Sequence, residues 1–124
     1  MTEAADAADP ALDAAFDALA HPTRRAVIAL LRRAPLRSGE LAAALSLPHP
    51  TTSRHLKVLR DAGLVDESPT PDDARVRVYH LCPAPFAALR GWLDEVEAFW
   101  GDQLSAFKAH AEAGARTAHP ADDP

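Results

Sequence analysis

The stretch from residue 49 to residue 65 constrains the fold of this chain more than any other, because it reads as one amphipathic helix with a defined end. One face is apolar at helical spacing, with a threonine one turn earlier: Thr52, Leu56, Leu59 and Ala62. Gly63 supplies the left-handed residue that ends such a helix, and an extended segment begins at Leu64. We therefore expect this helix to be buried on one side only.

The opposite face carries short hydroxyl side chains followed by long cations: Thr51, Ser53, Arg54, Lys57 and Arg60. A helix that enters the major groove of DNA needs short polar groups near the base edges and cations for the phosphates. An ordinary amphipathic helix with a solvated basic face gives the same charge pattern. The surrounding chain has to decide between these two interpretations.

The distribution of charge favours DNA. At 124 residues the chain is long enough for one core, and its formal net charge is -5, which is unexpected for a protein that binds DNA. Residues 21–63, however, hold eight cations against two carboxylates, a local charge of +6. Because a local patch attracts a polyanion more than total charge repels it, the middle of the chain is the candidate binding surface.

Apolar periodicity and helix breakers divide the rest of the chain. Residues 1–10 are rich in alanine and aspartate, and we expect them to be disordered. Three helices should follow, with Ser38 as the N-cap of the third, over residues 11–19, 23–33 and 39–45. A short turn at residues 46–48 joins the third helix to the basic helix, and such a pair makes a helix-turn-helix.

A β-hairpin is predicted directly after the basic helix. The chain supplies a strand, a polar turn and a second strand over residues 64–68, 69–74 and 75–81. In the second strand Arg75 and Arg77 alternate with valines, which leaves both arginines for the DNA backbone or the minor groove. A two-stranded hairpin is marginal alone and has to pack on the helices. Residues 11–82 therefore read as a winged helix-turn-helix DNA-binding domain.

A long last helix is predicted over residues 83–113, with a disordered tail over residues 114–124. Its apolar stripe holds both tryptophans: Leu89, Trp92, Leu93, Val96, Phe99, Trp100, Leu104 and Phe107. This much aromatic surface needs a partner, which is either the chain's own domain or a second copy. We favour self-association, because a twofold dimer presents two recognition helices about one turn of DNA apart.

Four segments carry a family resemblance: LAHPTRR at residues 19–25, ELAAAL at 40–45, TTSRHLKVLRDAGLV at 51–65 and YHL at 79–81. In this order and spacing, over roughly residues 12–82, they closely resemble the ArsR/SmtB family of bacterial winged-helix transcriptional regulators. The resemblance implies a mainly α fold with a small β-hairpin: a winged helix-turn-helix of five helices, whose dimer is built from the first and last helices. It also implies a homodimer, usually a repressor, that binds an inverted-repeat operator in double-stranded DNA.

Two sets of site residues follow from these interpretations. The residues expected to contact DNA are His49, Thr51, Thr52, Ser53, Arg54, His55, Lys57, Arg60, Arg75 and Arg77. The residues expected at the dimer interface are Leu12, Phe16, Leu89, Trp92, Leu93, Val96, Phe99, Trp100, Leu104 and Phe107.

The chain departs from the family pattern at two places. Pro48 stands where relatives often have a serine that caps the recognition helix, so we expect the cap elsewhere, with His49 as a candidate. The wing turn reads Asp72-Asp73-Ala74 where a Gly-Arg pair is common, which predicts weaker wing contacts with DNA.

Neither a metal site nor a cofactor is predicted. Thiolate sensors of the family place a Cys-x-Cys cluster on the third helix, which here reads GELAAAL. The last helix lacks the paired carboxylate and histidine ligands of other sensors, although it offers Asp94, Glu95, Glu97, Asp102 and His110. The single cysteine, Cys82, excludes an internal disulfide and fits a reducing compartment, and we expect its thiol to be inert.

Other function classes receive less support from the sequence. An enzyme would need a phosphate loop, a serine elbow or a metal-bound water motif, and we find none. No apolar run approaches the roughly 20 residues of a membrane span, so we expect a cytoplasmic protein. The alternative function is a winged-helix protein-interaction module that does not bind DNA, since the chain is acidic overall. The effector, if one exists, is not identified by the residues.

Overall fold

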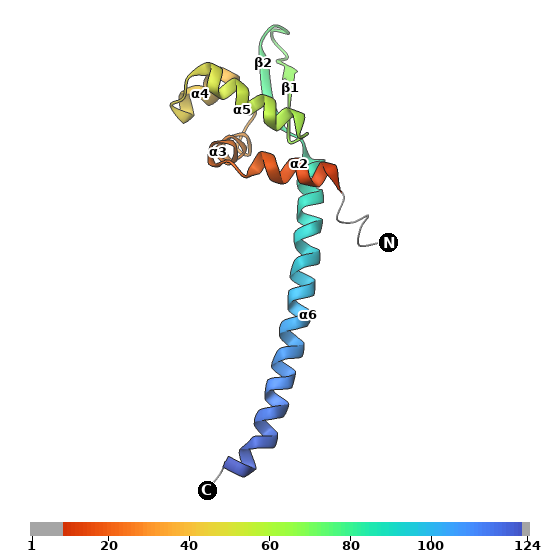
Figure 1. The fold of residues 1–124 in the computed structure, drawn as a ribbon. Helices are drawn as coiled ribbons and strands as arrows, with labels where there is room; N and C mark the ends of the chain where they lie inside the picture. Colours follow the sequence, from red (N-terminus) through yellow and green to blue (C-terminus); the bar gives the residue numbers. More distant parts are fainter. Residues whose placement is uncertain (1–8, 123–124) are drawn as a thin grey trace. The chain divides into compact units, whose positions relative to one another are not determined.

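The computed structural model describes residues 9–122, with side chains described for residues 9–115 (Figure 1). The elements are α2 (Pro10–Leu19), α3 (Pro22–Leu31), α4 (Ser38–Leu45), α5 (His49–Asp61), β1 (Val65–Pro69), β2 (Arg77–Leu81) and α6 (Pro83–Asp122). Over the described residues the predicted fold class is confirmed: five helices and one antiparallel hairpin. The chain divides into two compact units, the first ending at Leu89 and the second beginning at Arg90. No described helix is long and apolar enough to cross a membrane.

The core of the first unit takes one apolar face from each of its helices. Its buried members are Ala15, Ala18, Val27, Leu31, Leu41, Leu56, Leu59, Leu64, Val65 and Leu89. Burying one leucine or valine side chain contributes roughly 1.5–3 kcal/mol. Because α4 has only eight residues and would be marginal in isolation, this packing rather than helix propensity stabilises it.

Side chains close the corner between α2 and α3. His21 is the N-cap of α3, and its Nδ1 accepts a hydrogen bond from the Thr23 N–H at 3.1 Å. Arg24 Nε donates to the Ala18 carbonyl at 2.6 Å, and Arg25 donates to the Leu19 carbonyl at 2.7 Å. Cations at a helix C-terminus satisfy its last carbonyls and its dipole. These two arginines therefore cap the end of α2, so part of the local charge of +6 serves the fold.

The turn of the helix-turn-helix follows from local hydrogen bonds. Ser46 ends α4 in the left-handed conformation, with φ 55°, and the Leu47 N–H donates to the Ala42 carbonyl at 3.0 Å. The prediction of Ser38 as the N-cap of α4 is wrong. The cap is Arg37, whose backbone N–H donates to the Glu40 carboxylate at 2.9 Å.

The end of α5 is the one that Gly63 predicts. Gly63 has φ 77°, and its N–H donates to the Arg60 carbonyl at 2.9 Å. The Leu64 N–H donates to the Leu59 carbonyl at 3.0 Å, which completes a left-handed helix termination of the Schellman type. Leu64 is thus used to end the helix, and β1 begins at Val65, one residue later than expected.

The hairpin of β1, β2 and the turn between them, which we call the wing, pairs in a register that sets Val65 opposite Leu81 and Pro69 opposite Arg77. β2 begins at Arg77 instead of residue 75, because the turn holds Arg75 through its N–H and the Asp73 carboxylate at 3.0 Å. Leu36, before α4, forms an isolated bridge with Tyr79 on β2, so the wing is joined to the helices.

The first turns of α6 complete the core of the first unit. Leu89 is 8% exposed and lies in that core, so its assignment to the dimer interface is wrong. The helix continues to Asp122, through most of the segment for which the sequence predicts a disordered tail. That segment contains several alanines, the residue with the highest helix propensity. The predicted disordered segment at the N-terminus lies, up to residue 8, outside the described residues.

Candidate nucleic-acid interface

The two faces of α5 differ as the sequence predicts. Thr52, Leu56 and Leu59 are at most 1% exposed. Arg54 and Lys57, on the opposite side by helical spacing, are exposed, and Thr51 and Ser53 flank them half-buried. We call these four residues (Thr51, Ser53, Arg54 and Lys57) the recognition face. Short hydroxyls beside exposed cations are the groups that base edges and phosphates require.

Two residues of α5 that are predicted to contact DNA, Thr52 and His55, lie outside the recognition face. Thr52 is fully buried, and its hydroxyl donates to the Pro48 carbonyl at 3.2 Å, so its assignment to DNA is wrong. It faces the core because it stands one turn before Leu56. His55 is half-buried against α3, with its ring centroid 4.6 Å from that of His21. Burial, and then the charges of His21, Arg24 and Arg54, lower the pKa of His55.

The N-terminal end of α5 has no side-chain cap. Pro48 is the N-cap residue, and His49, the candidate cap, is instead the first residue of the helix. Its ring links the two helices of the motif, because Nε2 lies 3.0 Å from the Ser38 hydroxyl of α4 and Nδ1 lies 3.5 Å from the Ser53 hydroxyl. His49 is exposed and lies at the N-terminal end of α5, next to the recognition face.

Carboxylates accompany the cations of α5. Lys57 lies 3.0 Å from Asp61 one turn later, in a pair that is exposed on both sides. Arg60 lies 3.4 Å from Glu67 and 3.9 Å from Asp66, both on β1. Arg54 has no carboxylate partner among the described residues; it lies 3.5 Å from the Thr51 hydroxyl. Of these three cations, Arg54 is therefore the one that can hydrogen-bond to a base edge without first breaking an ion pair with a carboxylate.

The arginines of the wing are paired in the same way. Arg75 lies 3.3 Å from Asp73, and this hydrogen bond lowers the pKa of the Asp73 carboxyl. Arg77 lies 3.8 Å from Glu67. Burial raises the pKa of Tyr79, and the neighbouring Glu67 carboxylate raises it further. The wing thus carries its own counterions, and the weaker wing contacts with DNA expected from its acidic turn stay a prediction.

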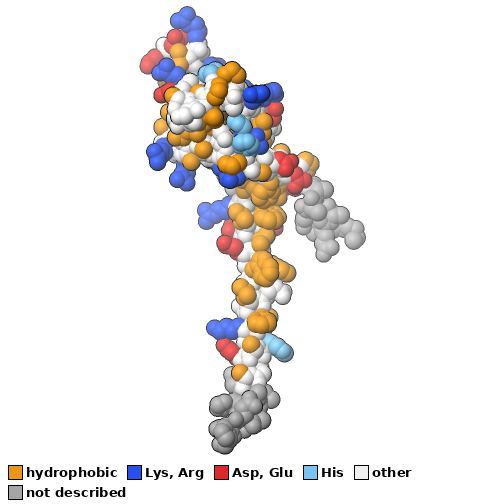
Figure 2. Space-filling model, turned by 60° about the vertical axis from the view of Figure 1, so that its left-hand side comes forward, with side chains coloured by type: hydrophobic (Ala, Val, Ile, Leu, Met, Phe, Trp, Pro, Cys, Tyr) orange, Lys and Arg blue, Asp and Glu red, His pale blue; other side chains and the backbone are white. Residues whose placement is uncertain are grey.

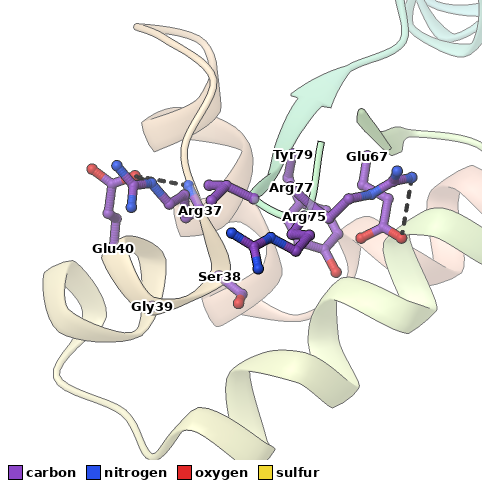
Figure 3. A pocket seen from close by; sticks show the side chains of 9 residues that line it. Arg37, Ser38, Gly39, Glu40, Glu67, Arg75, Arg77 and Tyr79 are labelled. Carbon is purple, nitrogen blue, oxygen red and sulfur yellow. Dashed lines mark hydrogen bonds and ion pairs between the residues drawn. The ribbon is translucent and has the colours of Figure 1, made fainter. Parts of the chain in front are cut away.

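A cleft of about 590 Å³ lies between the N-terminal end of α4 and the wing (Figure 3). It is lined by Arg37, Ser38, Gly39, Glu40, Glu67, Arg75, Val76, Arg77 and Tyr79. Figure 3 shows Arg75 extending from the wing toward Ser38, whereas Arg77 reaches toward Glu67. Arg37 and Glu67 are not among the residues predicted from the sequence. The position of Arg37 at the start of α4, the first helix of the helix-turn-helix, could have indicated a role for it. The position of Glu67 in the cleft depends on the register of β1 and β2, which the sequence does not give.

Among the described residues, no group of three or more histidine, cysteine or acidic side chains is placed to hold a metal ion. Cys82 is half-buried, and burial together with the Asp66 charge raises the pKa of its thiol. A raised pKa leaves less of the reactive thiolate at neutral pH.

Within the second unit, α6 carries apolar side chains along one face (Figure 2). The exposed fractions are 41% for Trp92, 50% for Leu93, 59% for Phe99, 57% for Trp100, 61% for Leu104 and 72% for Phe107. Val96 is half-buried. On α2, Phe16 is 38% exposed, whereas Leu12 is half-buried and packs against the core. An apolar surface of this extent is typical of interaction sites.

Known proteins resemble this chain over the same region. A family model described as a helix-turn-helix domain matches residues 19–68. The HTH-type transcriptional regulator Rv2034 of Mycobacterium tuberculosis (strain ATCC 25618 / H37Rv) is 44% identical over 95 residues, which cover 77% of this chain and 83% of that protein. The HTH-type transcriptional repressor SmtB of Mycobacterium tuberculosis (strain CDC 1551 / Oshkosh) is 46% identical over 57 residues, 44% of this chain and 42% of that protein.

Among solved structures, the crystal structure of an ArsR family transcriptional regulator, RHA00566, is similar over 73% of this chain and 97% of that chain. The two share 35% sequence identity, with a TM-score of 0.65. The similarity therefore extends over nearly the whole of that regulator.

Proposed function

Because this chain belongs to the ArsR family of winged helix-turn-helix transcriptional regulators, we propose that it is a homodimeric repressor that binds an inverted-repeat operator in double-stranded DNA. The observation that carries the proposal is the division of α5. Leu56 and Leu59 fix one side of this helix in the core, and Arg54 and Lys57 stand exposed on the other. We further propose that the protein acts in the cytoplasm and catalyses no reaction.

Each part of the surface has a separate role in this proposal. Thr51, Ser53 and Arg54 approach the base edges, because hydroxyls and a guanidinium can read the donors and acceptors of the major groove. Phosphates are held by Lys57 and Arg60 of α5 and by the wing, which carries Arg75 and Arg77. Since phosphate contacts fix the register on the duplex without reading sequence, selectivity should depend on the first group and affinity on the second.

The apolar face of α6 supports the homodimer. Phe99, Trp100, Leu104 and Phe107 are more than half exposed, and a second copy of the same helix offers a matching apolar surface. A twofold pair then presents two recognition helices to half-sites about one turn of DNA apart.

DNA binding measured against salt tests the proposal. The duplexes are the region upstream of the protein's own coding sequence and a scrambled duplex of equal length, titrated by fluorescence anisotropy. With 6–10 phosphate contacts per dimer, affinity should fall by about a thousandfold or more between 50 and 200 mM salt, and the upstream duplex should bind more tightly. An affinity for neither duplex in dilute buffer would refute DNA binding and favour the protein-interaction module, whose apolar contacts respond little to salt.

A further inference from the structure

We infer that the cleft between α4 and the wing binds one backbone phosphate of the operator, held between Arg37 and Arg75. This inference rests on the proposed function and adds to it a contact outside the recognition helix. It assigns Arg37 to DNA and separates the two wing arginines, of which Arg75 contacts the phosphate and Arg77 positions the wing.

The chemistry of the lining fits a phosphate diester. Three of the lining side chains are guanidinium groups, from Arg37, Arg75 and Arg77, and two are carboxylates, from Glu40 and Glu67. Guanidinium groups pair with phosphate oxygens through charged, often bidentate, hydrogen bonds. The lining side chains carry a net charge of +1, with Asp73 paired to Arg75 just outside them. A cleft of about 590 Å³ admits one phosphate together with ordered water.

The ion pairs of the free protein indicate which arginines are available to bind a phosphate of DNA. Arg37 lies 3.7 Å from Glu40, with exposed side-chain fractions of 61% and 52%. Arg75 lies 3.3 Å from Asp73, with exposed fractions of 91% and 40%. Exposed pairs of this kind are weak, so each arginine can exchange its carboxylate for a phosphate at little cost.

Arg77 is held differently. Its partner Glu67 is only 23% exposed and also pairs with Arg60 of α5. Arg77 is 45% exposed, less than Arg37 and Arg75, so its pair with Glu67 is less screened by water than the other two pairs. Arg77 therefore stays on Glu67, and Figure 3 shows the two side chains directed toward each other while Arg75 points toward α4.

The start of α4 leaves room for the ligand. A Cβ placed on Gly39 would meet no atom within 4 Å, so the first turn of the helix is open to a close neighbour. The partial positive charge of a helix N-terminus adds to the charge of the two arginines. The anion-binding character comes from the arginines, and the helix terminus reinforces it.

Arg37→Ala and Arg75→Ala test the inference, with Arg90→Ala as the matched control. Arg90 is an exposed arginine in an i,i+4 pair with Asp94 at 4.0 Å, so its loss changes net charge equally without touching the cleft. We expect each cleft variant to weaken binding about threefold to tenfold at 150 mM salt, equally on the upstream and scrambled duplexes, and to lower the salt slope by about one per protomer. Because both arginines hold one phosphate, the double variant should lose less than the product of the single losses.

Three results would overturn the inference. If Arg37→Ala binds as tightly as Arg90→Ala, the cleft does not contact DNA, although the proposed function stands on the binding of the wild type. If the wild type binds no DNA, both fail together. If inorganic phosphate shifts the Gly39 amide resonance saturably while DNA does not, the cleft takes a free anion instead.

Discussion

The Glu67 carboxylate of β1 lies 3.4 Å from a guanidinium nitrogen of Arg60 on α5. The same carboxylate lies 3.8 Å from Arg77 on β2, and the Glu67 side chain is only 23% exposed. One acid therefore joins the recognition helix to the wing. It also occupies Arg60, which we propose for a phosphate, so it competes with DNA for that cation.

The first prediction concerns this competition. Glu67→Gln should tighten DNA binding about threefold to tenfold at low salt, because Arg60 is released to pair with a phosphate. Asp72→Asn is the control, since it makes the same charge change at an exposed residue of the wing turn. Asp72 is in none of the ion pairs within the described part of the chain. Equal gains in anisotropy titrations of the two variants would reduce the effect of Glu67 to net charge alone.

The second prediction separates contacts with bases from contacts with phosphates. Arg54→Ala should cost about 1–3 kcal/mol on the operator and relax sequence preference, because Arg54 is proposed to contact a base edge. Lys57→Ala should weaken binding to all sequences alike, because it removes a phosphate contact. Competition of operator and scrambled duplexes for each variant measures both quantities. Unchanged selectivity in Arg54→Ala would mean that another side chain reads the bases.

The sequence predicts the elements of this fold well because their causes are local. Apolar residues three and four positions apart mark the helices, and Gly63 marks the end of α5 because few other residues tolerate φ 77°. Alternating valines mark β2 in the same way. Each of these signals lies within one element, so no knowledge of neighbouring elements is needed to interpret it.

The candidate site is predicted less well because its causes are tertiary. Arg24 counts as a cation of the basic region in the sequence, yet it caps the carbonyls of α2. Leu89 continues the apolar stripe of α6, yet it closes the core of the first unit. Glu67 reaches Arg60 and Arg77 only through the register of the wing. Such pairings join one element to another, and the periodicity within a single element does not encode them.

The third prediction tests the reassignment of Thr52. Thr52→Val keeps the shape of the side chain and removes the hydroxyl that donates to the Pro48 carbonyl. The free energy of unfolding should fall by about 0.5–1.5 kcal/mol, the usual contribution of one hydrogen bond. DNA affinity of the folded variant should be unchanged, because the side chain is fully buried. A loss of affinity at unchanged stability, measured by urea denaturation and anisotropy, would return Thr52 to the DNA contacts.

The fourth prediction concerns the homodimer. Trp100→Ala should raise the dimer dissociation constant at least tenfold, because large aromatic side chains dominate the energy of interfaces. Sedimentation equilibrium at micromolar concentration measures the change. Ser105→Ala is the control, since helical spacing sets it on the opposite side of α6 from the apolar face. A Trp100→Ala protein that sediments with the mass of the wild-type dimer contradicts the assignment of this face.

The fifth prediction is a pH dependence of stability. The pKa of His55 is lowered in the folded protein, by burial first and then by the charges of His21, Arg24 and Arg54. In the unfolded chain His55 has the ordinary histidine pKa of 6.5, so the unfolded chain binds a proton at this residue more readily than the folded protein does. The stability that neutral His55 allows above pH 6.5 is therefore lost as the pH falls below 6.5. The melting temperature should drop between pH 7.5 and 5.5, and the drop should be smaller in His55→Gln. His110→Gln, at an exposed histidine of α6, should retain the wild-type drop. If His55→Gln instead loses as much stability on acidification as the wild type, a group other than His55 causes the pH dependence.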